Sequence, residues 1–368
     1  MTTNWRSAIF TISTIKLLDF TITLFAYLEI WIISKISESS LITGILFTLM
    51  SVPYFFSYFT GTFIDMTRNK KGILFSLVFI FFIILLISQL ELLSNNFLAI
   101  ILAFYLSMII GGIIIDGSET ILSIWIKENV HESEYKKASS INRVITRSLR
   151  LIAVTLGGVL LTIDLKYSLF PPLIILGAII LLLLPIKMPS SNQSKTSLKQ
   201  GFIEGFNYIR KNKVLTQFTV LTIENLFFNM QGILILYYVE SFLHKGPLYF
   251  SLLSASAEIG IILGSMLAVR IKKGKLGYYN VIFRSLISAS LVSYILIHNI
   301  FLAVVPTFVI FLSSGINSVL TSSALLRNID KEYMGRTYGF IGVISNGLVT
   351  FSGPLGGIMI LTLGVWAS

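Results

Sequence analysis

Four acidic residues lie deep inside apolar segments, where an ionised side chain is costly. They are Asp19, Asp116, Glu224 and Glu258. At a helical rise of about 1.5 Å per residue, each lies roughly 15 to 20 Å from the nearest polar end of its segment, close to the middle of a bilayer core about 30 Å thick. A carboxylate facing lipid there costs at least ~2.5–3.5 kcal/mol. We therefore expect these groups to face a water-filled cavity, to pair with cations or to carry protons.

Basic residues are available to some of these acids. Lys16 precedes Asp19 by about one helical turn, so we expect a local ion pair. Glu119 lies one turn after Asp116, and two arginines near the start of a later apolar segment lie at a depth where they can meet it. These are Arg147 and Arg150. For every acid, the alternative to a functional role is a purely structural ion pair.

Glu224 and Glu258 have no basic residue at their own depth in their own segments. They are the best candidates for proton carriage, with Asp19 as a third. Asp19, Asp116 and Glu119 are predicted to line a substrate cavity. Asn225, Asn229 and Tyr237 follow Glu224 in the same segment and would add hydrogen-bonding groups to the cavity wall.

The composition predicts an all-α integral membrane protein. Of the 368 residues, 55% are hydrophobic and 12% are charged, with a mean hydropathy of +0.85, whereas soluble domains carry about 25% charged residues. Long apolar runs, rather than alternation with a period of two, favour helices over a β-barrel. Cysteine is absent, and the three histidines lack metal-ligand spacing. We therefore expect no enzyme activity, no metal and no cofactor.

Lysine and arginine predict the topology. We expect eleven spans, at residues 9–34, 41–64, 73–93, 97–126, 141–163, 168–187, 214–241, 249–271, 278–299, 301–326 and 337–364. Twenty basic residues follow the even-numbered spans and three follow the odd-numbered ones. This asymmetry predicts a multi-pass protein of the cell membrane with a cytoplasmic N-terminus. It also accounts for the net charge of +11 without a nucleic-acid partner.

An internal repeat divides the chain. The segment FLAIILAF (97–104) matches FLAVVPTF (301–308) at an offset of 204 residues, and the dipeptide KE at 127–128 matches KE at 331–332 at the same offset. We therefore expect two pseudo-symmetric six-helix bundles, residues 1–187 and 214–368, with the twelfth helix missing because the chain stops after the eleventh span. Residues 188–213 are predicted to be a cytoplasmic linker with a short amphipathic helix. Asp19 and Glu224 lie 205 residues apart, so the repeat places them on opposing walls of one site.

The segment GTFIDMTRNKKG (61–72) resembles the signature between spans 2 and 3 of the major facilitator superfamily. Three further segments resemble the drug and siderophore efflux branch, which includes macrolide and enterobactin exporters. Two of them are IKENVHESEYKKASSINRVITRSLRLIAVTLGG and GFIEGFNYIRKNKVL. The third resembles the branch's entrance to span 11 and reads NIDKEYMGRTYGFIGVISNGLVTFSGPLGG. Asn69, Met66 and Ala268 depart from the family pattern. The resemblance implies a conformational latch on the cytoplasmic side. Its residues would be Gly61, Asp65, Lys70, Lys71, Arg143, Arg147 and Arg336.

These patterns predict a secondary transporter that exchanges protons for a small amphipathic or cationic molecule such as a drug, an antibiotic or a siderophore. Export, and with it multidrug resistance, rests on the resemblance alone. The alternatives are a proton-coupled nutrient importer and a truncated homologue that does not transport. A phosphate-binding loop of the G-x-x-x-x-G-K-[ST] type is absent from the sequence. The expected partners are the substrate, protons and the lipid bilayer, and we expect a monomer.

Overall fold

The computed structural model is built of helices, and the residues that it describes contain no strand. The described residues are 4–37, 39–56, 67, 69–131, 134–186, 198–212, 215–216, 219, 222–268, 270–271, 276–329 and 334–364. The first helices are α1 (Trp5–Ile36), α2 (Ser40–Leu49), α3 (Val52–Phe55), α5 (Lys70–Ser94), α6 (Phe97–Asn129), α7 (Tyr135–Ile163), α8 (Phe170–Leu183) and α9 (Leu198–Lys211).

The remaining helices follow after residue 222. They are α11 (Glu224–Tyr237), which runs into a π-helical turn (Tyr238–Phe242), α12 (Pro247–Ala268), α13 (Leu276–Ser293), which runs into a 3₁₀ turn (Tyr294–Leu296), α14 (Ile300–Asn328), α15 (Met334–Thr350) and α16 (Ser352–Leu363). Helix α9 occupies the segment in which the sequence predicts an amphipathic helix. Its Ile209 is buried and packs with Leu215 and Phe340.

Asparagine defines several helix ends. The side chains of Asn4, Asn69 and Asn96 each accept a hydrogen bond from a backbone N–H in the first turn of α1, α5 and α6, respectively. Such caps satisfy N–H groups that have no partner inside the helix. Asn95 ends α5 in the left-handed conformation, with φ of 58°, which asparagine tolerates better than most residues.

Two expected spans are each broken into two helices. The span expected at 337–364 divides at Phe351 into α15 and α16, three residues before Pro354. A proline inside an apolar run predicts such a kink from the sequence alone. The span expected at 41–64 divides at Met50 and Ser51 into α2 and α3, just before Pro53. Proline lacks an N–H group and clashes with the carbonyl group four residues earlier, which explains both breaks.

Eight helices of the described residues are long and apolar enough to cross a membrane: Trp5–Ile36, Lys70–Ser94, Phe97–Asn129, Ser140–Ile163, Pro247–Ala268, Gly277–Leu296, Ile300–Thr321 and Phe340–Leu363. The shorter helices α2 and α8 are also apolar. Eleven continuous spans were expected. The difference arises because span 2 is broken, because α8 has 14 residues, and because α11 begins only at Glu224.

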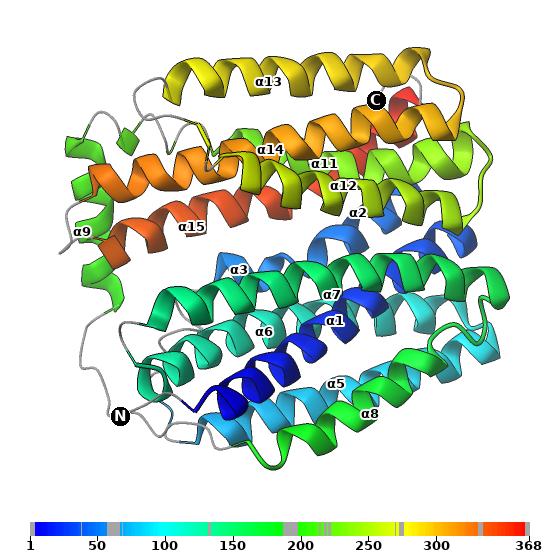
Figure 1. The fold of residues 1–368 in the computed structure, drawn as a ribbon. Helices are drawn as coiled ribbons and strands as arrows, with labels where there is room; N and C mark the ends of the chain where they lie inside the picture. Colours follow the sequence, from blue (N-terminus) through cyan, green and yellow to red (C-terminus); the bar gives the residue numbers. More distant parts are fainter. Residues whose placement is uncertain are drawn as a thin grey trace.

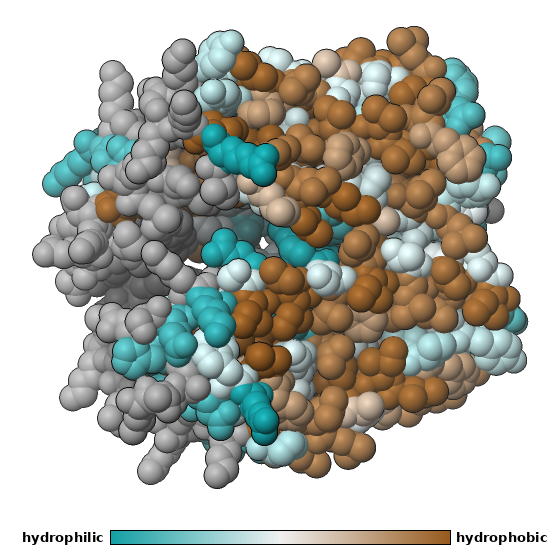
Figure 2. Space-filling view, viewed as in Figure 1, coloured by the Kyte–Doolittle hydropathy of each residue, from teal (hydrophilic) through white to brown (hydrophobic). Residues whose placement is uncertain are grey.

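Large apolar side chains cover the outside of the helices. Leu98, Ile174, Leu181, Val281 and Leu302 are each at least 60% exposed. A soluble protein rarely exposes so much contiguous apolar surface. Figure 2 shows the same band as brown side chains over both halves of the molecule. These side chains face the bilayer.

The helices form two groups that meet along their length (Figure 1). Helices α1, α5, α6, α7 and α8 lie together in the lower part of the view, and α11 to α14 lie in the upper part. Helix α2 packs against α16, and α7 packs against α12. We call the end of the molecule that carries α9 the α9 end, and the opposite end the far end.

At the far end, small residues bring α2 and α16 into backbone contact. A Cβ atom at Gly353 would lie 2.0 Å from the carbonyl oxygen of Gly44, and one at Gly357 would lie 2.5 Å from the carbonyl oxygen of Ser40. The hydroxyl group of Ser40 donates a hydrogen bond of 2.7 Å to the carbonyl oxygen of Gly357. Side chains larger than hydrogen at the two glycines would therefore hold the helices apart.

The α2–α16 contact is one seam between the two groups of helices. The second seam, between α7 and α12, is also closed at the far end. Ser251 of α12 donates a 2.8 Å hydrogen bond to the carbonyl oxygen of Val154. Tyr27 and Trp31 of α1 both stack on the ring of Phe250, with ring centroids 5.0 and 5.8 Å away. Near the same end, Lys35 of α1 and Glu240 of the π-helical turn form an ion pair of 3.0 Å. Both seams are therefore shut at the far end.

Toward the α9 end, a hollow lies between the two groups of helices. Figure 2 shows it left of the centre of the view, bordered by hydrophilic side chains, whereas the side chains at the right are mostly apolar. The two groups of helices are therefore in close contact at the far end, and the hollow lies nearer the α9 end.

We predict that Gly353→Ala loosens the far end, because the new methyl group would meet the backbone of α2. The measurement is the labelling rate of Thr43→Cys, a fully buried position of α2, by a membrane-impermeant maleimide. The chain has no cysteine, so the background is clean. We expect labelling to become several-fold faster.

Gly177→Ala in α8 is the matched control, because the nearest atom to its new Cβ would be 3.8 Å away. Its labelling rate should equal that of the parent Thr43→Cys protein. Equal rates in all three proteins would contradict the role assigned to the α2–α16 contact.

Candidate functional site

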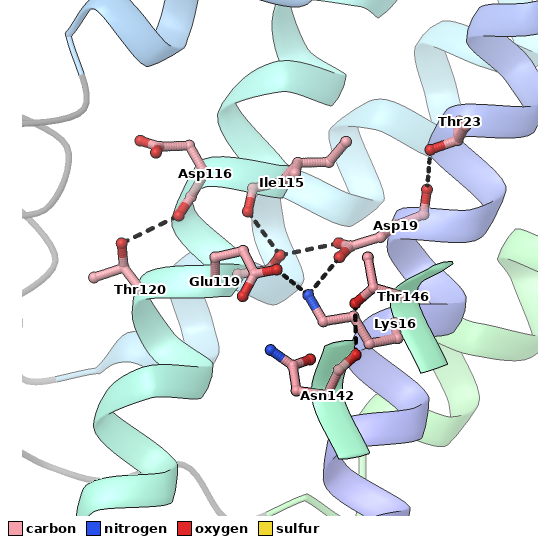
Figure 3. A network of polar contacts seen from close by, with 10 residues as sticks. Lys16, Asp19, Thr23, Ile115, Asp116, Glu119, Thr120, Asn142 and Thr146 are labelled. Atoms are coloured by element: carbon pink, nitrogen blue, oxygen red, sulfur yellow. Dashed lines mark hydrogen bonds and ion pairs between the residues drawn. The ribbon is translucent and has the colours of Figure 1, made fainter. Parts of the chain in front are cut away.

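A charged network joins α1 and α6 (Figure 3). The ammonium group of Lys16, which is fully buried, lies 2.7 Å from Asp19 Oδ2. It also forms an ion pair with Glu119 of α6. The hydroxyl oxygen of Ser118 lies 3.2 Å from the other oxygen of Asp19 and 3.0 Å from the carbonyl oxygen of Ile115. The expected Lys16–Asp19 ion pair is therefore present, and it extends to a second helix.

One cation thus serves two carboxylates. The side chain of Glu119 is 43% exposed, whereas that of Asp19 is 12% exposed. Because one ammonium group balances one negative charge, the trio carries a surplus negative charge when both acids are ionised. Because Glu119 is the more exposed of the two acids, solvent can reach the surplus negative charge at its carboxylate.

Asp116 lies on α6 one turn before Glu119, and its carboxylate points away from Lys16 (Figure 3). Its backbone carbonyl oxygen accepts a 3.1 Å hydrogen bond from Thr120. The structure therefore places the three acids predicted to line the cavity in the first half of the chain on α1 and α6, and it joins Asp19 and Glu119 through Lys16.

A second charged cluster joins the two groups of helices. Glu258 of α12 accepts a 3.2 Å hydrogen bond from Arg147 Nη1 of α7 and lies 3.8 Å from Arg150 Nε. The side chain of Glu258 is 13% exposed, and those of Arg147 and Arg150 are 39% and 45% exposed. The arginines were expected near Glu119, and the structure corrects this. Val154 and Gly158 lie on the same face of α7 as the two arginines and pack on Ser251 of α12. This face of α7 is therefore directed toward α12.

Glu224 also has a basic partner. It is the first residue of α11 and forms an ion pair with Arg284 of α13, which in turn donates a hydrogen bond to Asn280. In the sequence, Glu224 and Glu258 have no basic residue at their own depth in their own segments, and the structure supplies a cation to each. The cations come from other helices, which a comparison within one span cannot reveal.

Sequence analysis missed Glu29, although the acid is visible within the apolar run FAYLEIWI. Its side chain is buried, and Oε1 has no hydrogen-bond partner among the described residues. Oε2 lies 2.6 Å from the hydroxyl oxygen of Ser107, which also lies 2.7 Å from the carbonyl oxygen of Phe104. A hydroxyl group has one hydrogen, so a neutral Glu29 that donates to Ser107 satisfies both contacts.

Polar side chains of α11 contact neighbouring helices. Asn225 donates a 2.6 Å hydrogen bond to the hydroxyl oxygen of Ser345 in α15, and Asn229 donates one of 2.7 Å to the carbonyl oxygen of Asn225. The hydroxyl group of Tyr237 donates to Thr43 of α2 at 3.1 Å. The contacts of Asn225 and Tyr237 join α11 to both of the broken spans, whereas that of Asn229 lies within α11. A role of the same side chains in binding substrate stays a prediction.

A family model described as the Major Facilitator Superfamily matches residues 9–354. This match covers nearly the whole chain. The chain belongs to the Major Facilitator Superfamily. In a comparison with curated proteins, no sequence matches it. Family and fold together indicate a multi-pass membrane protein and support a secondary transporter of a small molecule.

Solved structures of transporters share the fold. A point mutant of the nucleoside transporter NupG has a TM-score of 0.73 at 13% identity, over 96% of this chain and 90% of that one. A bacterial homologue of the human lysosomal transporter Spinster, inward-facing and unoccupied, has a TM-score of 0.72 at 16% identity, over 98% and 83%. The inward-open xylose transporter XylE from E. coli has a TM-score of 0.70 at 13% identity, over 98% and 92%.

The latch that the superfamily signature predicts is described only in part. Gly61 and Asp65 lie outside the described residues, as does the side chain of Arg336. Lys70 is buried and donates a 3.0 Å hydrogen bond to the carbonyl oxygen of Thr67. Lys71 donates to the carbonyl oxygen of Leu184. Arg143 is exposed on α7. The latch stays a prediction.

We predict that Ser107→Ala lowers the free energy of unfolding in detergent by about 1–2 kcal/mol, because it removes the partner of a buried carboxyl group. Glu29→Gln should unfold like the parent protein, since a neutral amide also donates a hydrogen bond to Ser107. The control is Ser88→Ala, a buried serine that bonds to a carbonyl group of its own helix. Equal losses in both serine variants would contradict the hydrogen bond between Ser107 and Glu29, and a destabilised Glu29→Gln protein would contradict the neutral state of Glu29.

For the Glu224–Arg284 pair we predict a stabilising interaction of about 1 kcal/mol, because both side chains are about one-third exposed and partly screened. Glu224→Gln and Arg284→Gln should each destabilise the protein, and the double variant should recover part of the loss in a double-mutant cycle. Glu128→Gln, at an exposed position near the end of α6, should change nothing. Additive losses in the cycle would show that the two side chains do not interact.

Proposed function

We propose that this protein is a proton-coupled secondary transporter that exports a small amphipathic or cationic molecule by alternating access. The observation that carries the proposal is the single ammonium group, that of Lys16, shared by the carboxylates of Asp19 and Glu119. The surplus negative charge can be balanced by a proton or by the cationic group of a substrate. Two ligands that balance the same charge exclude each other, and this exclusion is what antiport requires.

Glu258 supports the second step, in which the open side changes. With the far end closed, Glu258 contacts Arg147 and Arg150 of the other group of helices. Opening the far end separates α7 from α12 and so removes both cations from Glu258. A carboxylate that loses its cations inside the membrane can be neutralised by a proton. Proton uptake at Glu258 would therefore favour the state that is open at the far end.

Glu224 has a smaller part in this scheme. Its partner Arg284 lies on α13, which belongs to the same half of the chain as α11. A movement between the two halves leaves this pair together. We therefore propose Asp19, Glu119 and Glu258 as the groups that exchange protons, and Glu224 as a group that holds α11 against α13.

The direction of transport follows from two proposals. The asymmetry of lysine and arginine supports a cytoplasmic α9 end, so the hollow would load substrate from the cytoplasm. The resemblance of the sequence to the drug and siderophore efflux branch supports export. A proton-coupled nutrient importer is the second candidate, because the same carboxylates would serve proton symport.

The test uses purified protein in liposomes with an imposed pH gradient and phenethylamine as the probe amine. We expect the wild-type protein to move the amine against the flow of protons. Glu119→Gln should lower this gradient-driven rate at least about tenfold, because the amide removes the surplus charge. Glu128→Gln, two to three turns further along α6 and exposed, is the matched control and should transport normally.

The direction in which the amine moves relative to the protons distinguishes an exporter from an importer. Movement of the amine together with protons would replace export with import. No movement with either sign of the gradient would overturn proton coupling. A wild-type rate in Glu119→Gln would contradict the role of the shared ammonium group.

A further inference from the structure

Arg147 and Arg150 bring more positive charge to α7 than the nearby carboxylate requires. Two guanidinium groups meet the single carboxylate of Glu258. Arg147 uses one N–H group to donate a hydrogen bond to it. Arg150 lies 3.8 Å away, which is an ionic contact but too long for a hydrogen bond. The cluster therefore carries a net positive charge.

Arg150 has unused hydrogen-bond donors. A guanidinium group has five N–H donors in a fixed plane, and Arg150 makes no hydrogen bond within the part of the chain that the structure describes. Its side chain is 45% exposed, although it lies on the face of α7 that packs on α12. A planar donor group that is open to water suits a carboxylate, which it binds through two parallel hydrogen bonds.

The positive cluster and the acidic network both lie within electrostatic range of one aromatic side chain. Tyr54 of α3 interacts electrostatically with Asp19, Arg150, Asp116 and Glu119. The acidic network has three carboxylates and the ammonium group of Lys16, so its net charge is negative when the acids are ionised. Charges of both signs therefore act on the region around Tyr54.

We propose that Arg150, supported by Arg147, binds an anionic group of the substrate, and that the substrate is a zwitterion with an amino group and a carboxylate. The inference rests on the proposed function, in which the acidic network binds the amino group. The contact with Arg150 adds a positively charged partner for the substrate's carboxylate. The protein should therefore prefer zwitterions over plain amines. The dipole of such a molecule lies between Glu119 and Arg150.

The test compares three probes on one scaffold: phenethylamine, which is a cation, 3-phenylpropionate, which is an anion, and phenylalanine, which carries both groups. Binding to the purified wild-type protein in nanodiscs is measured by calorimetry. We expect phenylalanine to bind at least about tenfold more tightly than either partial probe, as expected for an added charge-assisted hydrogen-bonded pair.

The variant Arg150→Gln should remove this advantage, so that phenylalanine binds no better than phenethylamine. Arg150→Lys should retain part of it, because a charge remains without the planar fork. Arg6→Gln, an exposed arginine at the start of α1, is the matched control and should keep the full advantage. A structural role of Arg150 would weaken all probes together and leave their ratio unchanged.

Two outcomes overturn the inference: equal binding of phenylalanine and phenethylamine by the wild-type protein, or an unchanged ratio in Arg150→Gln. Neither affects the proposed function, which fails instead if a pH gradient drives no amine transport. Binding of 3-phenylpropionate alone would overturn both, because the acidic network would then have no part in recognition.

Discussion

An ionised side chain at mid-depth in a bilayer costs about 2.5–3.5 kcal/mol even on the mildest scales, and this cost decides which helices of the protein must touch. Lys16 ties α1 to α6, Arg284 ties α13 to α11, and Arg147 ties α7 to α12. Apolar side chains provide little drive for association in lipid. The ionic contacts therefore choose among helix partners that would otherwise be nearly equivalent.

Two kinds of contact hold the halves together at the far end. The α2–α16 seam uses glycine and serine, whose small size lets the backbones meet. Helix α12 is held by stacking of α1 rings on Phe250 and, deeper, by the ion pairs of Glu258 with α7. The energy of the glycine and serine contact changes little when water enters. Opening the other contact separates Glu258 from its cations and leaves these charges unpaired. Proton coupling fits the second seam for this reason.

The sequence predicted the fold class because hydrophobic length and charge distribution are local properties. The helices, the kink before Pro354 and the amphipathic segment around Ile209 all follow from composition and spacing. The break of span 2 at Met50 and Ser51 was missed, although Pro53 signals it. Glu29 was missed because one acid within an apolar run was not weighed with the others.

The sequence by itself determined that acids lie at mid-depth and that Lys16 precedes Asp19 by one turn. It could not show that Glu258 meets Arg147 and Arg150, because these residues lie more than a hundred positions apart and on helices whose neighbours depend on packing. Only the tertiary structure decided the partner of each charge. The physical reason is that the cost of a buried charge depends on depth, whereas its relief depends on which helix supplies the opposite charge.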